Sequence, residues 1–128
     1  MRVIACLALA LVAACTGDET LSGYGAADRT WLLQELDGAP VTTRVTLTFP
    51  EPGQLGGEAP CNLYSGQQTV PYPWFKAENI VATRRACPAL DLETRYFAAL
   101  TRMTLSEVLG NTLILRDETG AEMVFTAG

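Results

Sequence analysis

The segment from Asp91 to Met103 reads DLETRYFAALTRM, and it decides the fold class. Its apolar residues recur every three or four positions, which is the spacing of one face of an α-helix. Asp91 stands where it can cap the amides of the first turn, and the carboxylate of Glu93 suits the positive end of the helix dipole. The apolar stripe consists of Leu92, Tyr96, Ala99, Leu100 and Met103. We therefore expect one amphipathic helix over these residues.

The residues before this helix alternate as strands do. In the stretch VTLTF, Thr46 and Thr48 are expected to face outward and the three apolar residues inward. Trp31 and Leu33 share one face of an earlier strand. The strands predicted here cover Thr30–Leu36, Val45–Phe49, Gln54–Ala59, Leu63–Val70 and Ala77–Thr83.

The remaining segments complete the prediction of the fold. Prolines interrupt Pro71–Phe75 and indicate a sheet edge, because proline cannot donate a backbone hydrogen bond. After the helix, the strands Thr112–Arg116 and Glu122–Thr126 flank a glycine-containing hairpin loop. Strands on both sides of a single helix define the α+β class. We expect a curled antiparallel sheet, or an open β-barrel, of about seven or eight short strands packed on that helix.

Composition excludes several classes of function. The chain has 128 residues, a formal net charge of -5 and no histidine. Negative charge repels phosphate, and Arg84 and Arg85 are the only adjacent cations, so we expect no binding to nucleic acid. The lack of histidine removes the commonest general base and metal ligand. We expect no catalytic residue, no metal site and no cofactor.

The N-terminal residues indicate export and acylation. Residues 3–14 form an uninterrupted apolar run that is too short for a transmembrane helix and is typical of a signal peptide. The run ends in LVAAC, residues 11–15, which resembles a bacterial lipobox. We therefore expect a lipoprotein signal peptide over residues 1–14 and acylation of Cys15. The alternative is an ordinary signal peptide in which a cysteine happens to lie near the cleavage site.

The residues after Cys15 bear on location. Aspartate at position 16 would favour the inner membrane, and this chain has Thr16, so we expect a lipid anchor in the outer membrane and a domain that faces the periplasm. Residues 16–28 read TGDETLSGYGAAD and show no apolar periodicity. They are predicted to be a flexible tether, followed by one domain over residues 29–128.

Cys61 and Cys87 are the two thiols that remain for the domain. In an oxidising compartment such a pair favours a disulfide. The rival interpretations are weaker, because a redox site favours Cys-x-x-Cys spacing and a zinc site needs four ligands. We expect a structural disulfide between them.

Several short motifs occur in order along the chain: Trp31-x-Leu33, Gly38-x-Pro40-Val41, Leu47-x-Phe49, Cys61-Asn62-x-Tyr64-x-Gly66, Thr83-x-x-x-Cys87-Pro88, and Glu93 with Phe97. Together with the closing hairpin, this pattern resembles the META domain family, which includes HslJ-type heat-shock lipoproteins. The resemblance covers Thr30 to Phe125, and its motif residues here are Trp31, Asn62, Tyr64, Gly66 and Thr83. Pro60 and Arg85 depart from the family pattern. The resemblance implies an antiparallel sheet curled around one helix, a role in envelope stress tolerance and no catalytic constellation.

These observations favour a non-catalytic, lipid-anchored envelope protein that binds a protein partner. The candidate surface is Tyr72, Trp74 and Phe75, because aromatic residues dominate interfaces. The alternative is that Trp74 and Phe75 fill the core. Two other functions stay open: an inhibitor of a lysozyme-like hydrolase, whose basic surface would suit the acidic chain, and a carrier of a small apolar ligand.

Overall fold

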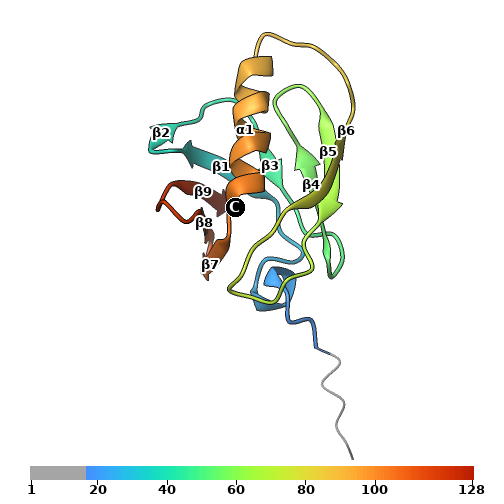
Figure 1. The fold of residues 1–128 in the computed structure, drawn as a ribbon, viewed down its shortest axis with the longest axis vertical. Coiled ribbons are helices and arrows are strands. Elements are labelled where there is room, and N and C mark those ends of the chain that lie inside the picture. Colours follow the sequence, from blue (N-terminus) through green and yellow to red (C-terminus); the bar gives the residue numbers. More distant parts are fainter. Residues whose placement is uncertain (1–16) are drawn as a thin grey trace, which may run out of the picture.

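The computed structural model describes residues 17–128, which contain nine strands, one 3₁₀-helix and one α-helix (Figure 1). The predicted signal peptide and Cys15 lie outside these residues. The helices are η1 (Leu21–Tyr24) and α1 (Leu90–Arg102). The strands are β1 (Trp31–Leu36), β2 (Ala39–Pro40), β3 (Thr46–Leu47), β4 (Gln54–Glu58), β5 (Leu63–Gln67), β6 (Glu78–Ala82), β7 (Leu105–Leu109), β8 (Thr112–Arg116) and β9 (Glu122–Ala127).

The helical periodicity correctly predicted α1, which buries Tyr96, Ala99 and Leu100. The predicted cap is wrong. The helix begins one residue earlier, at Leu90, and its N-cap is Ala89, which makes no side-chain cap hydrogen bond. A turn in which the Leu90 amide donates to the Cys87 carbonyl starts the helix early, so Asp91 lies inside the first turn.

Six strands form the larger sheet around β1. One edge of β1 pairs with β2 and β3, and the other edge leads through β9 and β8 to β7. A register shift between Leu33 and Glu35 changes the side-chain alternation, so that Trp31, Leu33 and Leu36 are all buried. The shared inner face predicted for Trp31 and Leu33 is confirmed.

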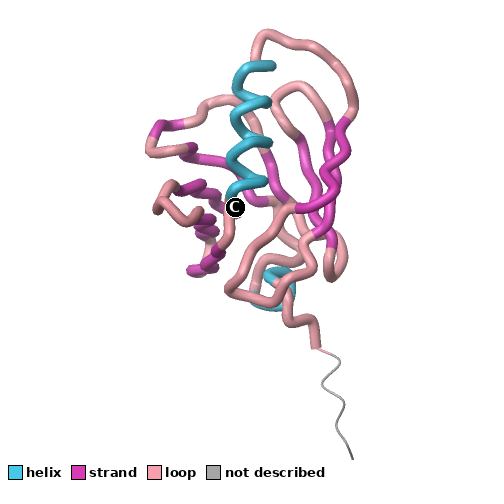
Figure 2. The backbone as a smooth tube through the Cα atoms, in the orientation of Figure 1, coloured by secondary structure: helices cyan, strands magenta, loops and turns pink. Residues whose placement is uncertain are grey.

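The smaller sheet has the order β4-β5-β6. One isolated bridge joins Thr48, just after β3, to Gly56 of β4, and a second joins Trp74, in the β5–β6 connection, to Leu105 of β7. Figures 1 and 2 show α1 standing between the sheets. The α+β class is confirmed, and the described residues form two curled sheets rather than a closed barrel. The count exceeds the predicted seven or eight strands because β2 and β7 were not expected; β7 (LSEVL) lacks a clear alternation.

Thr46 is buried, although the alternation predicted that it faces outward. Its hydroxyl accepts a hydrogen bond from the Glu58 amide at 2.9 Å, and its carbonyl accepts one from the Tyr64 hydroxyl at 2.7 Å. The smaller sheet therefore packs over β3. Gly57 makes this close approach possible, with φ of +151° and a backbone too near Thr46 for any side chain.

The tether predicted over residues 16–28 is wrong for most of its described part. Leu21 and Ala26 are fully buried, and the Trp31 indole donates to the Ala26 carbonyl at 3.0 Å. The Tyr72 amide donates to the Glu19 carbonyl at 2.8 Å. The two fully buried residues are five positions apart and form no repeat, so the segment carries no periodicity that predicts its burial.

Gly57→Ala should lower the free energy of unfolding by about 3 kcal/mol or more, because strain and a backbone clash combine. The added Cβ would lie 2.2 Å from the Thr46 carbonyl oxygen. Gly38→Ala is the matched control, since φ is +79° there and the space around it is open. Urea denaturation measures both. Equal losses for the two variants would contradict the packing of β4 on β3.

Candidate functional site

The predicted disulfide is present and joins the turn before β5 to the segment before α1. Cys61 and Cys87 are 26 residues apart in sequence, and their Cα atoms lie 5.6 Å apart. On the chain-entropy model, closing a loop of this length contributes about 3.5 kcal/mol. The bond therefore holds the β4–β5 hairpin against the start of the helix.

Glu93 is a buried carboxylate, only 5% exposed, in the first turn of α1. Its Oε1 accepts the Cys61 amide at 3.0 Å, and its Oε2 accepts the Asn62 Nδ2 at 2.7 Å. Hydrogen bonds to a charged acceptor are stronger than neutral ones and offset part of the cost of burying the charge. The helix-dipole role predicted for Glu93 does not include these contacts. The available signal was its position three residues before Tyr96 and seven before Leu100, on the apolar stripe.

Asn62 connects this carboxylate to the segment after β6. Its Oδ1 accepts the Thr83 hydroxyl at 2.9 Å and the Arg85 amide at 2.6 Å. Its Nδ2 also donates to the Arg85 carbonyl at 3.0 Å. The Thr83 Oγ1 in turn accepts the Leu63 amide at 3.1 Å. We call Cys61, Asn62, Thr83, Arg85 and Glu93 the motif network.

The two departures from the family pattern fit this arrangement. Pro60 lies between β4 and β5, in a turn closed by the Ala59 amide and the Asn62 carbonyl at 2.7 Å, so no ladder bond needs its nitrogen. Arg85 joins the network through its backbone, and its side chain is exposed. Neither change disturbs a hydrogen bond of the network.

Tyr64 and Tyr96 form a second buried polar pair. The Tyr64 hydroxyl donates to the Thr46 carbonyl, so the Tyr96 hydroxyl, 2.6 Å away, donates to Tyr64. The Phe97 ring packs edge-on against Tyr64, with ring centroids 5.2 Å apart. Burial raises the pKa of Tyr64 well above its usual value of 10.0, and burial raises the pKa of Tyr96 as well.

Gly66 is required by the same packing. A Cβ at this position would lie 2.5 Å from the Ile80 side chain and 2.9 Å from the Glu78 carbonyl. The five predicted motif residues, Trp31, Asn62, Tyr64, Gly66 and Thr83, all make contacts that hold the fold together. The structure therefore gives them structural roles.

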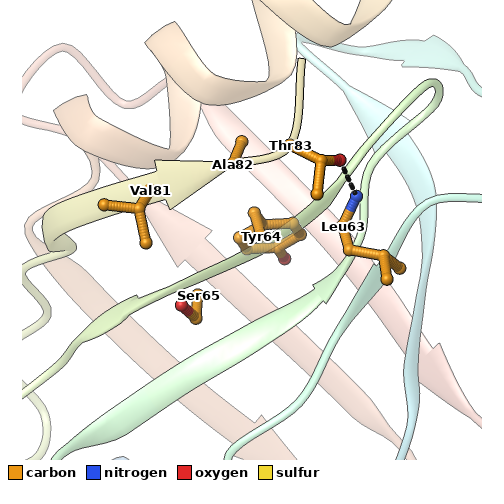
Figure 3. Close-up of a pocket in the computed structure, with 6 residues that line it drawn as sticks. All are labelled: Leu63, Tyr64, Ser65, Val81, Ala82 and Thr83. Atoms are coloured by element: carbon orange, nitrogen blue, oxygen red, sulfur yellow. Dashed lines mark hydrogen bonds between the residues drawn. The ribbon is translucent and has the colours of Figure 1, made fainter. Parts of the chain in front are cut away.

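The outer face of the smaller sheet carries exposed apolar side chains. The register pairs Ser65 with Val81 and places Leu63 and Thr83 on the same face. Leu63 is 61% exposed and Val81 is 65% exposed. Figure 3 shows the shallow pocket that these residues line with Tyr64 and Ala82, and the hydrogen bond between Leu63 and Thr83. We call Leu63, Ser65 and Val81 the β5–β6 face.

The three predicted surface aromatics have different environments. Trp74 is 58% exposed, whereas Phe75 is 3% exposed and belongs to the core. Tyr72 is half-buried and stacks on Tyr24, with ring centroids 4.7 Å apart. The surface prediction holds for Trp74 and is wrong for Phe75, which follows Trp74 in the chain and so points to the opposite side.

Within residues 17–128, no three histidine, cysteine or acidic side chains gather where they could hold a metal ion. Asp117 lies in the β8–β9 turn and accepts hydrogen bonds from Thr119 and Ala121. These bonds lower the pKa of the Asp117 carboxyl, and the bond from the Thr119 hydroxyl has the largest effect. No helix among the described residues is long and apolar enough to cross a membrane.

Comparisons with known proteins agree with this architecture. A family model described as "META domain" matches residues 25–128. An NMR structure of a protein from Burkholderia xenovorans superposes with a TM-score of 0.67 at 21% identity, covering 84% of this chain and 86% of that one. A crystal structure of a DUF4847 family protein from Bacteroides vulgatus gives 0.64 at 14% identity, covering 81% and 94%. At these identities the solved structures show a shared fold alone. No curated protein is significantly similar to the chain in sequence.

Glu93→Gln should lower the free energy of unfolding by about 2–3 kcal/mol. Glutamine has one acceptor oxygen, so its amide nitrogen would face one of the two donors that the carboxylate now satisfies. Glu118→Gln, in the exposed β8–β9 turn, is the control and should change little. Urea denaturation of the oxidised proteins decides. An unchanged midpoint for Glu93→Gln would show that the network does not stabilise the fold.

The tyrosine pair predicts a loss of stability at alkaline pH. Because the folded-state pKa of each tyrosine is raised, the folded state keeps the protons longer than the unfolded chain does. This stabilisation is complete below about pH 10, the usual tyrosine pKa, and is lost as the pH rises further. The double variant Tyr64→Phe/Tyr96→Phe should show a shallower decline in unfolding free energy above that pH. An identical decline would contradict the pair's role.

Proposed function

Because the chain belongs to the META domain family, we propose that it is a lipid-anchored accessory protein of the bacterial cell envelope that binds a protein partner and catalyses no reaction. The anchor is the acylated Cys15, and the domain faces the periplasm from the outer membrane. Binding of the partner contributes to tolerance of envelope stress. The sequence of residues 1–16 supports the anchor, and the disulfide supports an oxidising compartment.

The main support for a binding role is that the polar side chains of the motif network are already hydrogen-bonded within the protein. The carboxylate of Glu93 and the amide of Asn62 each bond to the protein's own backbone and side chains. A catalytic group needs to reach a substrate. These groups are buried, so we assign function to the surface.

The β5–β6 face is the proposed site of the protein partner. It offers two apolar side chains that are more than half exposed, and β6 is an edge strand of its sheet. Edge strands can pair with a strand of another protein, while neighbouring side chains give specificity. Asn79, with φ of +53°, interrupts β6 near its start and leaves Ile80–Ala82 as the regular part of that edge.

Of the two alternative functions, the apolar-ligand carrier fits less well. Tyr96, Leu100 and Met103 of the helical region are at most 1% exposed and occupy the space between the sheets. One observation supports the second alternative, an inhibitor of a lysozyme-like hydrolase: the net charge of -5 complements a basic target. The same experiment distinguishes it, because the captured partner would then be such a hydrolase.

A photo-reactive residue at Ser65 should form a discrete adduct with one envelope protein in intact cells. Leu63→Asp/Val81→Asp should remove this adduct without lowering the urea midpoint, because both side chains already face solvent. Leu109→Asp, at a position that is 56% exposed on β7, is the control and should keep the adduct. The readout is immunoblotting followed by mass spectrometry of the adduct. An adduct that survives the double substitution would refute the proposed face.

A further inference from the structure

Three aromatic side chains gather at one end of the domain. Tyr24 belongs to η1, while Tyr72 and Trp74 lie between β5 and β6. The rings of Tyr24 and Tyr72 are stacked, with an angle of 12° between their planes. Tyr24 and Trp74 are both more than half exposed, and Trp74 borders the partly exposed Leu105. We call Tyr24, Tyr72 and Trp74 the aromatic end.

The described chain starts beside this aromatic end. The backbone of Tyr72 is hydrogen-bonded to Glu19, four residues beyond Cys15. Figure 1 shows η1 and the β5–β6 connection together at the end of the molecule where the described chain begins. Four residues span at most about 14 Å when fully extended. A lipid on Cys15 would therefore hold the aromatic end close to a bilayer surface.

We propose that the aromatic end inserts at the boundary between the phospholipid headgroups and the acyl chains and fixes the orientation of the domain on the membrane. This inference rests on the proposed lipid anchor. Tyrosine and tryptophan favour the boundary between hydrocarbon and water, because each has an apolar body and a polar tip. The short connection keeps the cluster at a high local concentration near the lipid, so weak contacts suffice.

Charge identifies the kind of lipid surface. Four acids and two bases lie within six residues of the aromatic end in sequence: Asp18, Glu19, Asp28, Arg29, Lys76 and Glu78. Lys76 is paired with Glu78 at 2.8 Å. This end therefore has no positive excess that would attract anionic lipids. The contact is made by aromatic side chains on zwitterionic phospholipid, and anionic lipid does not strengthen it.

The orientation leaves the proposed partner site free. The aromatic end lies near the C-terminus of α1, because the Phe75 amide, next to Trp74, donates to the Thr104 carbonyl just after the helix. The β5–β6 face lies near its N-terminus, because the amide of Cys61, two residues before Leu63, donates to Glu93. A helix of 13 residues is about 20 Å long, so these sites lie near opposite ends of it. The bilayer contact and the β5–β6 face therefore do not compete.

Tryptophan fluorescence tests the inference, because the chain has only two tryptophans and Trp31 is fully buried. Protein purified from membranes is reconstituted into phosphatidylcholine vesicles, with or without bromine on the acyl chains. Bromine should quench most of the Trp74 emission, defined as the signal that Trp74→Phe removes. Replacing part of the lipid with phosphatidylglycerol should not increase the quenching.

Trp74→Phe/Leu63→Trp is the matched control, because Leu63 is as exposed as Trp74 and lies near the other end of α1. Its new tryptophan should escape quenching. Equal emission of Trp74 in brominated and plain vesicles would overturn the inference, as would equal quenching at position 63 or quenching that requires anionic lipid. Vesicle flotation tests the anchor separately. Protein that floats with an unquenched Trp74 overturns only the orientation, whereas protein that does not float overturns the anchor and the orientation together.

Discussion

The buried carboxylate of Glu93 is the constraint on which the arrangement of the domain depends. A charge removed from water is costly unless donors surround it, and here the donors come from the turn before β5. Asn62 extends the contact to Thr83 and to the backbone of Arg85. The first turn of α1 is therefore connected to the chain before β5 and to the chain after β6. The Cys61–Cys87 disulfide crosses the same junction covalently. The smaller sheet therefore has a defined position relative to α1.

This use of polar groups determines where function can reside. The motif residues Trp31, Asn62 and Tyr64 are buried. Membership of the META domain family therefore implies a shared fold before it implies a shared ligand. The exposed apolar side chains of the β5–β6 face and of the aromatic end lie near opposite ends of α1. An anchored domain with its two surfaces arranged in this way would face the bilayer with the aromatic end and a protein partner with the β5–β6 face.

The spacing of apolar residues along the chain predicted the helix and most strands, because these elements depend on residues close in sequence. The helix followed from the spacing of Tyr96 and Leu100, and most strands followed from alternation, whereas the burial of Thr46 and of Leu21 depends on contacts between distant segments. The disulfide was predictable because two thiols remained for the domain. The acceptor role of Glu93 was not predicted, because its donors come from residues about thirty positions earlier in the chain.

Native-state hydrogen exchange tests the central claim, that the motif network locks the smaller sheet to the helix. The amides of Cys61 and Arg85 donate to Glu93 and Asn62, and both lie outside regular strands. If the network is a stable part of the core, NMR should show that these two amides exchange as slowly as those of β1 and β9, through global unfolding. Exchange as fast as that of the amide of Glu118, in the exposed β8–β9 turn, would contradict the account.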